Sequence, residues 1–176
     1  MAVVDLYIDT LHYNADGSLI VPGAMLPPSG HGTPLFFAEF TFETVAANDN
    51  DSIYRVLKKM PGDIIPVKFD IASDGVGGLS DVNVGLWKPF KAGVAGVVIL
   101  ENCLADAIDL SSAVTFASPK DGLKDVAIES RGKKRLFELA GHDILTRLPE
   151  YDIAFKAVAA ESAVGTVAGI LWYAQG

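Results

Sequence analysis

The feature that most constrains the fold is a two-residue alternation of apolar and polar side chains, broken by turn signals about every 8 to 12 residues. The clearest case is residues 35–45, where Phe36, Phe40 and Phe42 fall on one face and Glu39 and Glu43 on the other. This alternation is typical of strands that bury one face. Related patterns predict strands at 2–8, 19–21, 53–60, 64–72, 82–87, 93–100, 152–159 and 166–173.

Helical signals are few. Residues 125–139, closed by Gly141, form the only convincing helical region, and residues 105–112 are expected to be a helical turn or a loop. Hairpins are predicted between 35–45 and 53–60, and between 152–159 and 166–173. The pattern predicts one all-β domain over residues 1–176, mainly an antiparallel sandwich or barrel with one short helix.

Residues 22–34 contain four of the nine prolines and three glycines, so they cannot pair fully in a sheet. We expect a loop or an extended arm. Such an arm lies on its own domain or reaches a neighbouring molecule, and the second is the favoured interpretation.

The composition limits the possible partners. The net charge of −8 would repel a phosphate backbone, so nucleic-acid binding is not expected. The one basic cluster, Arg131, Lys133, Lys134 and Arg135, lacks interleaved aromatic residues and is expected to be a solvated turn. Its alternative role is a contact with an acidic face of a neighbouring protein. The apolar fraction of 50% indicates either burial in an oligomer or an excess of Ala and Val in strands and turns.

No membrane or secretory signal is readable. The first ten residues contain Asp5 and Asp9 and lack a basic start followed by an apolar run. No apolar run reaches the ~18 residues of a membrane span. Cys103 is the only cysteine, so an internal disulfide is impossible and a reducing compartment is suitable. We expect a protein that starts in the cytoplasm.

No catalytic motif is readable either. His12, His31 and His142 lie far apart and form no zinc-binding spacing. No Gly-x-Ser-x-Gly motif is present, and Cys103 has no activating neighbour in the sequence. The glycine-rich run at 75–78 lacks the lysine and the helix start of a phosphate-binding loop, which indicates a turn. We expect no enzyme, no catalytic residue and no cofactor.

Acidic turns are the remaining candidates for a metal site. Asp49, Asn50 and Asp51 fall in one turn, and Asp74 and Asp81 flank the glycine-rich run. Neither group has the spacing of a calcium loop, so solvated carboxylates are expected rather than a metal. Paired carboxylates for glycoside hydrolysis meet only in the fold and stay open at this point.

The run from residue 48 to 87 resembles a recurrent segment of the capsid decoration (cement) proteins of tailed bacteriophages. The motifs are NDNDS at 48–52, IYRV at 53–56, IIPV at 64–67, SD and GG within 73–78, and DVNVGLW at 81–87. The YDI run at 151–153 and residues 165–173 are similar in kind. The resemblance implies a jelly-roll-like β-sandwich that assembles, often as a trimer, on the outer face of the virion capsid. The implied partner is the major capsid protein, and no enzyme activity is implied.

Other interpretations remain open. A neck or tail position in the virion requires the same kind of β-rich oligomer. A carbohydrate-binding or glycan-processing jelly roll is the third, and it requires Trp87 or Trp172 in a concave pocket beside two carboxylates. The expected contact surfaces are the arm at 22–34 and the exposed face of the strand from Phe36 to Phe42.

Overall fold

The computed structural model describes residues 5–7, 34–44, 51–89, 96–160 and 162–176. The strand predicted at 19–21, His12, His31 and all but the last residue of the arm at 22–34 lie outside these ranges.

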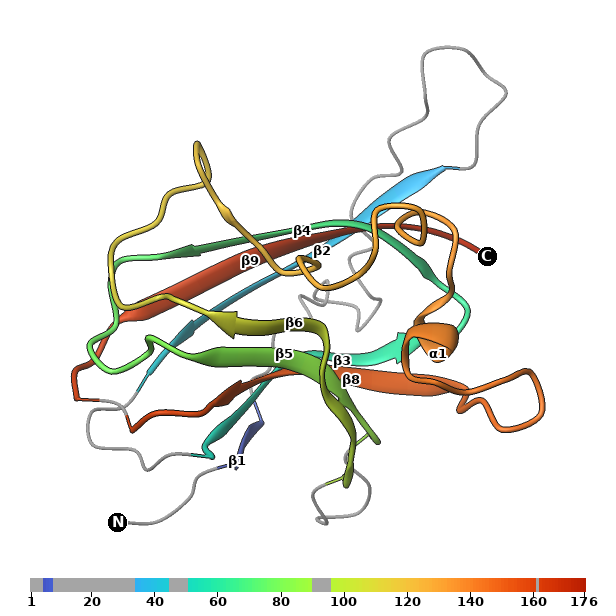
Figure 1. Ribbon diagram of the computed structural model, residues 1–176, viewed down its shortest axis with the longest axis horizontal. Helices are drawn as coiled ribbons and strands as arrows, with labels where there is room; N and C mark the ends of the chain where they lie inside the picture. Colours follow the sequence, from blue (N-terminus) through green and yellow to red (C-terminus); the bar gives the residue numbers. More distant parts are fainter. Residues whose placement is uncertain (1–4, 8–33, 45–50, 90–95, 161) are drawn as a thin grey trace, which may run out of the picture.

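The described chain is built of strands with one four-residue helix (Figure 1). One sheet has the strand order β1-β3-β8-β5-β6, and the other has the order β2-β9-β4-β7. The elements are β1 (Asp5–Tyr7), β2 (Leu35–Glu43), β3 (Ile53–Pro61), β4 (Ile65–Ser73), β5 (Val82–Trp87), β6 (Val98–Ile108), β7 (Lys120–Asp121), α1 (Leu136–Leu139), β8 (Glu150–Ala157) and β9 (Thr166–Ala174).

The strand order is that of a jelly roll. From β2 to β9, the chain changes sheet at every step except between β5 and β6, which produces two antiparallel sheets of four strands. β1 adds to the edge of one sheet by pairing parallel with β3. The predicted all-β sandwich is therefore confirmed.

The core lies between the two sheets and is rich in aromatic rings. On β2, Phe40 and Phe42 are buried, whereas Glu39 and Glu43 are exposed, as the alternation predicts. The centre of the Phe40 ring lies 5.4 Å from the centre of the Phe155 ring on β8, in the other sheet. Such edge-to-face contacts across the sandwich add to the burial of the rings themselves.

Both predicted hairpins are wrong. β2 and β3 lie in opposite sheets, and so do β8 and β9. Each N-terminal strand pairs instead with a C-terminal one, β2 with β9 and β3 with β8. Alternation identifies a strand and its buried face, but it does not identify the strand's partner, because each jelly-roll connection can cross the core.

The predicted helix over 125–139 is also wrong in extent. Only Leu136–Leu139 are helical, and the preceding residues form successive turns. Gly132 has a φ of +67°, and its N–H donates to the Pro66 carbonyl of β4 at 2.9 Å. A left-handed residue tied to a strand interrupts an α-helix. Gly141 (φ +75°) follows α1, in agreement with the expected end of the helix.

β6 differs from its prediction as well. It begins at Val98 and continues to Ile108, so residues 105–108 are strand rather than a helical turn. Its register against β5 shifts three times. At Gly85 the β6 backbone comes so close that a Cβ atom would lie 2.2 Å from the Leu100 carbonyl oxygen. Only glycine allows this approach.

Candidate functional site

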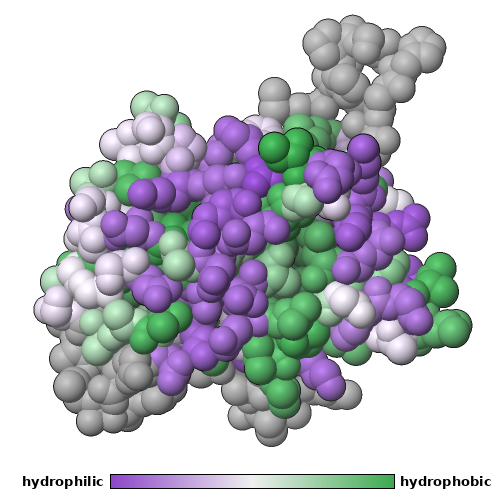
Figure 2. Space-filling view, viewed as in Figure 1, coloured by the Kyte–Doolittle hydropathy of each residue, from purple (hydrophilic) through white to green (hydrophobic). Residues whose placement is uncertain are grey.

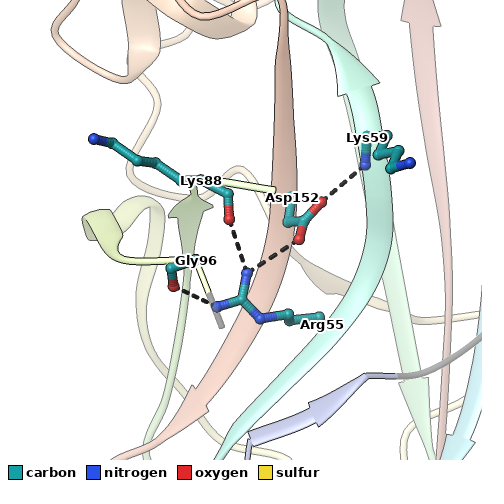
Figure 3. Close-up of polar contacts among 5 residues, drawn as sticks. All are labelled: Arg55, Lys59, Lys88, Gly96 and Asp152. Carbon is teal, nitrogen blue, oxygen red and sulfur yellow. Dashed lines mark hydrogen bonds and ion pairs between the residues drawn. The ribbon is translucent and has the colours of Figure 1, made fainter. Parts of the chain in front are cut away.

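A buried ion pair joins two neighbouring strands of the five-stranded sheet. Arg55 on β3 and Asp152 on β8 have fully buried side chains, and Nη1 of the arginine lies 3.0 Å from Oδ2 of the carboxylate (Figure 3). Removing two charges from water costs several kcal/mol per ion, on the order of what their attraction returns. A pair at this depth therefore has to satisfy further hydrogen bonds.

The Arg55 guanidinium supplies those bonds to the connection between β5 and β6. Its Nη1 donates to the Lys88 carbonyl at 3.1 Å, and its Nη2 donates to the Gly96 carbonyl at 2.6 Å (Figure 3). The other oxygen of Asp152 accepts from the Lys59 N–H at 2.9 Å. One planar guanidinium thus ties the end of β5 and the residue that leads into β6 to the centre of the sheet.

Exposed apolar side chains lie directly before the strand held in this way and at its start. Val97 is 66% exposed, and Val98 and Leu100 are exposed as well. We call these three residues the β6 apolar strip, and Figure 2 shows hydrophobic surface gathered over the start of β6. β6 is an edge strand, so the strip lies at the border of the sheet.

The second half of β6 is covered by the chain itself. Asp125 donates its N–H to the Leu104 carbonyl at 3.3 Å, and its carboxylate accepts from the Asp106 N–H at 2.6 Å. Among the described residues, no segment other than β5 and the Lys88 that follows it makes a backbone hydrogen bond to the strip. Edge strands commonly carry Lys or Pro as protection against pairing, and the strip contains neither.

A lysine neutralises the acidic residue that follows the strip. Lys156 Nζ lies 2.7 Å from Glu101 and 2.9 Å from Asp51, and these bonds, first the one to Glu101, raise the pKa of the lysine. The Glu101 carboxylate therefore does not stand as an uncompensated charge beside the apolar residues.

Two residues considered for catalytic chemistry, His142 and Cys103, lie within the described chain. His142 Nδ1 lies 2.7 Å from the Tyr151 hydroxyl, which also accepts from the Leu148 N–H at 2.9 Å. Burial raises the pKa of the Cys103 thiol to about 12, so at neutral pH it is the protonated, unreactive form.

Of the predicted acidic groups, Asp49 and Asn50 lie outside the described residues, and Asp51 and Asp74 have separate partners. Asp51 pairs with Lys156, while Asp74 accepts from the Thr166 N–H at 2.7 Å. Within the described residues, no three His, Cys, Asp or Glu side chains are grouped as metal ligands. In the glycine-rich run, Gly75 and Gly78 both have positive φ, which confirms a turn.

The two tryptophans lie in different sheets. Trp87 is 1% exposed, and its indole N–H has no hydrogen-bond partner among the described residues, so the ring offers no stacking face to a sugar. Trp172 is half-buried on β9 with its ring 5.3 Å from Phe37. The face of β2 that carries Phe37 is thus partly covered by the strand's own neighbour.

The basic cluster forms a turn before α1, as predicted. Arg131 is engaged internally: it pairs with Asp121 at 2.7 Å and donates to the carbonyls of Val126 and Leu123. Lys133 and Lys134 are exposed.

Sequence reasoning missed Arg55 and Asp152. The available signal was one charge inside each of two otherwise apolar runs, IYRV and YDIA, with opposite signs. A two-residue alternation implies that every second side chain of a strand is exposed to solvent. This inference fails for a strand that is buried on both faces, such as β5, in which all six residues are buried.

No family model matches this chain, and no curated protein sequence matches it. A chain of the structure described as the cyanophage Pam1 capsid asymmetric unit is similar at a TM-score of 0.41 and 14% identity. The similarity covers 86% of this chain and 92% of that one. In the part of the chain that the structure describes, no helix is long and apolar enough to cross a membrane.

Proposed function

We propose that the protein is a virion structural protein: a decoration or cement subunit that binds the capsid shell of a tailed phage and has no enzyme activity. The resemblance of residues 48–87 to such proteins supports this function. Most of the motifs that carry the resemblance build strands and turns of the sandwich: IYRV lies in β3, and VNVGLW is β5.

The observation that carries the proposal is the β6 apolar strip. Exposed Val and Leu side chains at a sheet edge raise the free energy of the protein in water by about 25 cal/mol for each Å² of apolar area left uncovered. A protein surface that covers the strip would recover this energy. The buried Arg55 fixes the strip's position before binding, which lowers the ordering cost of association.

A shell-binding experiment tests the function. Shells assembled from the phage's own major capsid protein are mixed with purified protein, separated on a gradient and analysed for copies bound per shell. We expect saturable binding, and at least a tenfold weaker affinity for Val97→Asp. Ile128→Asp is the matched control, because Ile128 is 84% exposed but lies outside the strip.

The outcome also separates the alternatives. Absence of saturable binding to shells, with the protein found in purified tails or necks, would replace decoration with a tail or neck function. Equal binding by Val97→Asp and the wild-type protein would remove the strip as the contact surface.

A further inference from the structure

The two ends of the sandwich carry opposite charge. The basic end, residues 131–148, contains α1 and has five Lys or Arg against two acidic residues, a net charge of +3. The whole chain has a net charge of −8, so the other residues together carry −11. In Figure 1, α1 and the loop after it lie at the right end of the molecule's longest axis.

The acidic end consists of residues 73–81, 106–116 and 158–165, with 161 left out. These described residues contain Asp74, Asp81, Asp106 and Asp109 and no Lys or Arg. Backbone hydrogen bonds tie the three segments together, among them Val76 N–H to Leu110 and Ser162 N–H to Gly77. The turns after β4, β6 and β8 lie at the left end of the long axis (Figure 1).

The basic end also has an apolar tip. Ile144 is 64% exposed and Leu145 is 89% exposed, and Figure 2 shows hydrophobic surface at the right extreme of the molecule. The acidic end has exposed apolar side chains too, Phe116, Val158 and Val164. Each end therefore combines apolar side chains with charge of one sign.

The apolar tip is held rigidly. Asp143 Oδ1 accepts from Leu145 N–H at 2.9 Å and from Thr146 N–H at 2.8 Å. The Thr146 hydroxyl accepts from the Asp143 N–H at 3.0 Å. The hydrogen bonds that Thr146 donates lower the pKa of the Asp143 carboxylate. Tyr151 pins the base of the loop through Leu148. A preorganised tip loses little entropy on binding.

Several cations of the basic end are available to a partner. Lys133 and Lys134 are exposed and make no ion pair with any described residue. Arg147 is exposed as well, with its guanidinium 5.6 Å from the centre of the Phe137 ring. The two acidic residues of this end are engaged: Glu138 accepts from the Arg135 N–H at 2.7 Å, and Asp143 bonds within the loop.

We infer that a second copy of this chain binds end to end, with the basic end of one copy on the acidic end of the next. The net charge of −8 makes two copies repel each other in most orientations. The opposite charges of the two ends favour the end-to-end orientation. Since the two contacting surfaces differ, the contact is heterologous, and it forms a ring or an open chain. This inference does not depend on the capsid as a partner.

The test uses two charge-reversed proteins and their mixture. One is Lys133→Glu/Lys134→Glu, which makes both ends acidic, and the other is Asp106→Lys/Asp109→Lys, which brings the charge of the described acidic end from −4 to 0. Masses are measured by light scattering and sedimentation in about 0.05 M and about 0.5 M NaCl. We expect wild-type multimers at low salt, at least tenfold weaker association of each variant alone, and restored association in the equimolar mixture.

Matched controls separate this contact from a general charge effect. Lys68→Glu/Lys88→Glu changes the net charge by the same amount outside both ends and should keep the wild-type mass. Ile144→Ser/Leu145→Ser should weaken association at both salt concentrations, whereas Val97→Asp should not. A wild-type monomer under all conditions, or a mixture that stays monomeric, overturns the inference. Recovery in the mixture also shows that both variants fold. A loss of association only in the Lys68/Lys88 control overturns the inference equally.

Discussion

Substitution of Asp152 by alanine should be among the most destabilising single changes in the chain. The change removes the carboxylate partner of Arg55 at a position where both side chains are fully buried. The guanidinium would keep its bonds to the Lys88 and Gly96 carbonyls but lose the Asp152 carboxylate. Breaking a buried pair in this way costs about 3–5 kcal/mol. The lost bond to the Lys59 N–H adds to the cost in the same direction.

For a chain of this length, each kcal/mol lowers the unfolding midpoint by about 2–4 °C, so Asp152→Ala should melt about 6–20 °C lower. Urea titration followed by tryptophan fluorescence measures the free energy directly, because Trp87 is buried in the same sheet. Glu150→Ala is the matched control: it removes an exposed carboxylate from the same strand and should change stability by about 0.5 kcal/mol or less.

The reasoning is refuted if Asp152→Ala loses less than about 1 kcal/mol while Glu150→Ala behaves as expected. That result would mean that water or a rearranged side chain compensates the arginine. A change in the slope of the urea titration would indicate an altered unfolded or native state instead.

Three further predictions test the strand contacts and two titrating groups. Gly85→Ala should lower the free energy of unfolding by about 3 kcal/mol or more, because the new Cβ would clash with the Leu100 carbonyl oxygen. Gly132→Ala has open space but a positive φ, so it should lower the same quantity by about 1 kcal/mol in the urea titration. With a pKa of about 12 instead of 9.0, the Cys103 thiol is about a thousandfold less ionised to thiolate at pH 8. Its alkylation, monitored by mass spectrometry, should therefore be slow until urea unfolds the chain, and equal rates in the folded and unfolded states would contradict this. The raised pKa of Lys156 means that its contribution to stability is complete below the ordinary value of 10.5 and is lost as the pH rises through the folded value. The stability difference between wild type and Lys156→Met should therefore stay constant up to about pH 10 and shrink as the pH rises above 10.5. A difference that stays constant at higher pH would show that the lysine's ion pairs contribute nothing.

The strands could be predicted from the sequence because burial of one face imposes a period of two. β2, β3, β4 and β9 agree closely with their predicted ranges for this reason. The pairing of strands could not be predicted, since it depends on which sheet each connection reaches. A two-residue alternation is the same whether the next strand lies beside it or across the core.

The interrupted helix shows a second limit. Val126 and Leu136 are both buried, and their separation suits a helix. The departure from the predicted helix arises at Gly132, whose backbone hydrogen bond to Pro66 depends on a strand more than 60 residues earlier in the chain. A local pattern carries no information about such a long-range bond. Ile128, one of the apolar residues of the predicted helix, is exposed as a result.

The buried pair and the β6 apolar strip connect stability with function. Replacing a buried pair by apolar residues of similar volume is often neutral or stabilising, so stability alone does not explain Arg55 and Asp152. What an apolar pair could not do is donate to the Lys88 and Gly96 carbonyls. Arg55→Met/Asp152→Leu should therefore keep most of the unfolding free energy that Asp152→Ala loses, yet release the start of β6. Hydrogen exchange should then accelerate at residues 97–100, and shell binding should weaken as it does in Val97→Asp. If the double variant retains both slow exchange and full binding, the guanidinium does not position the strip.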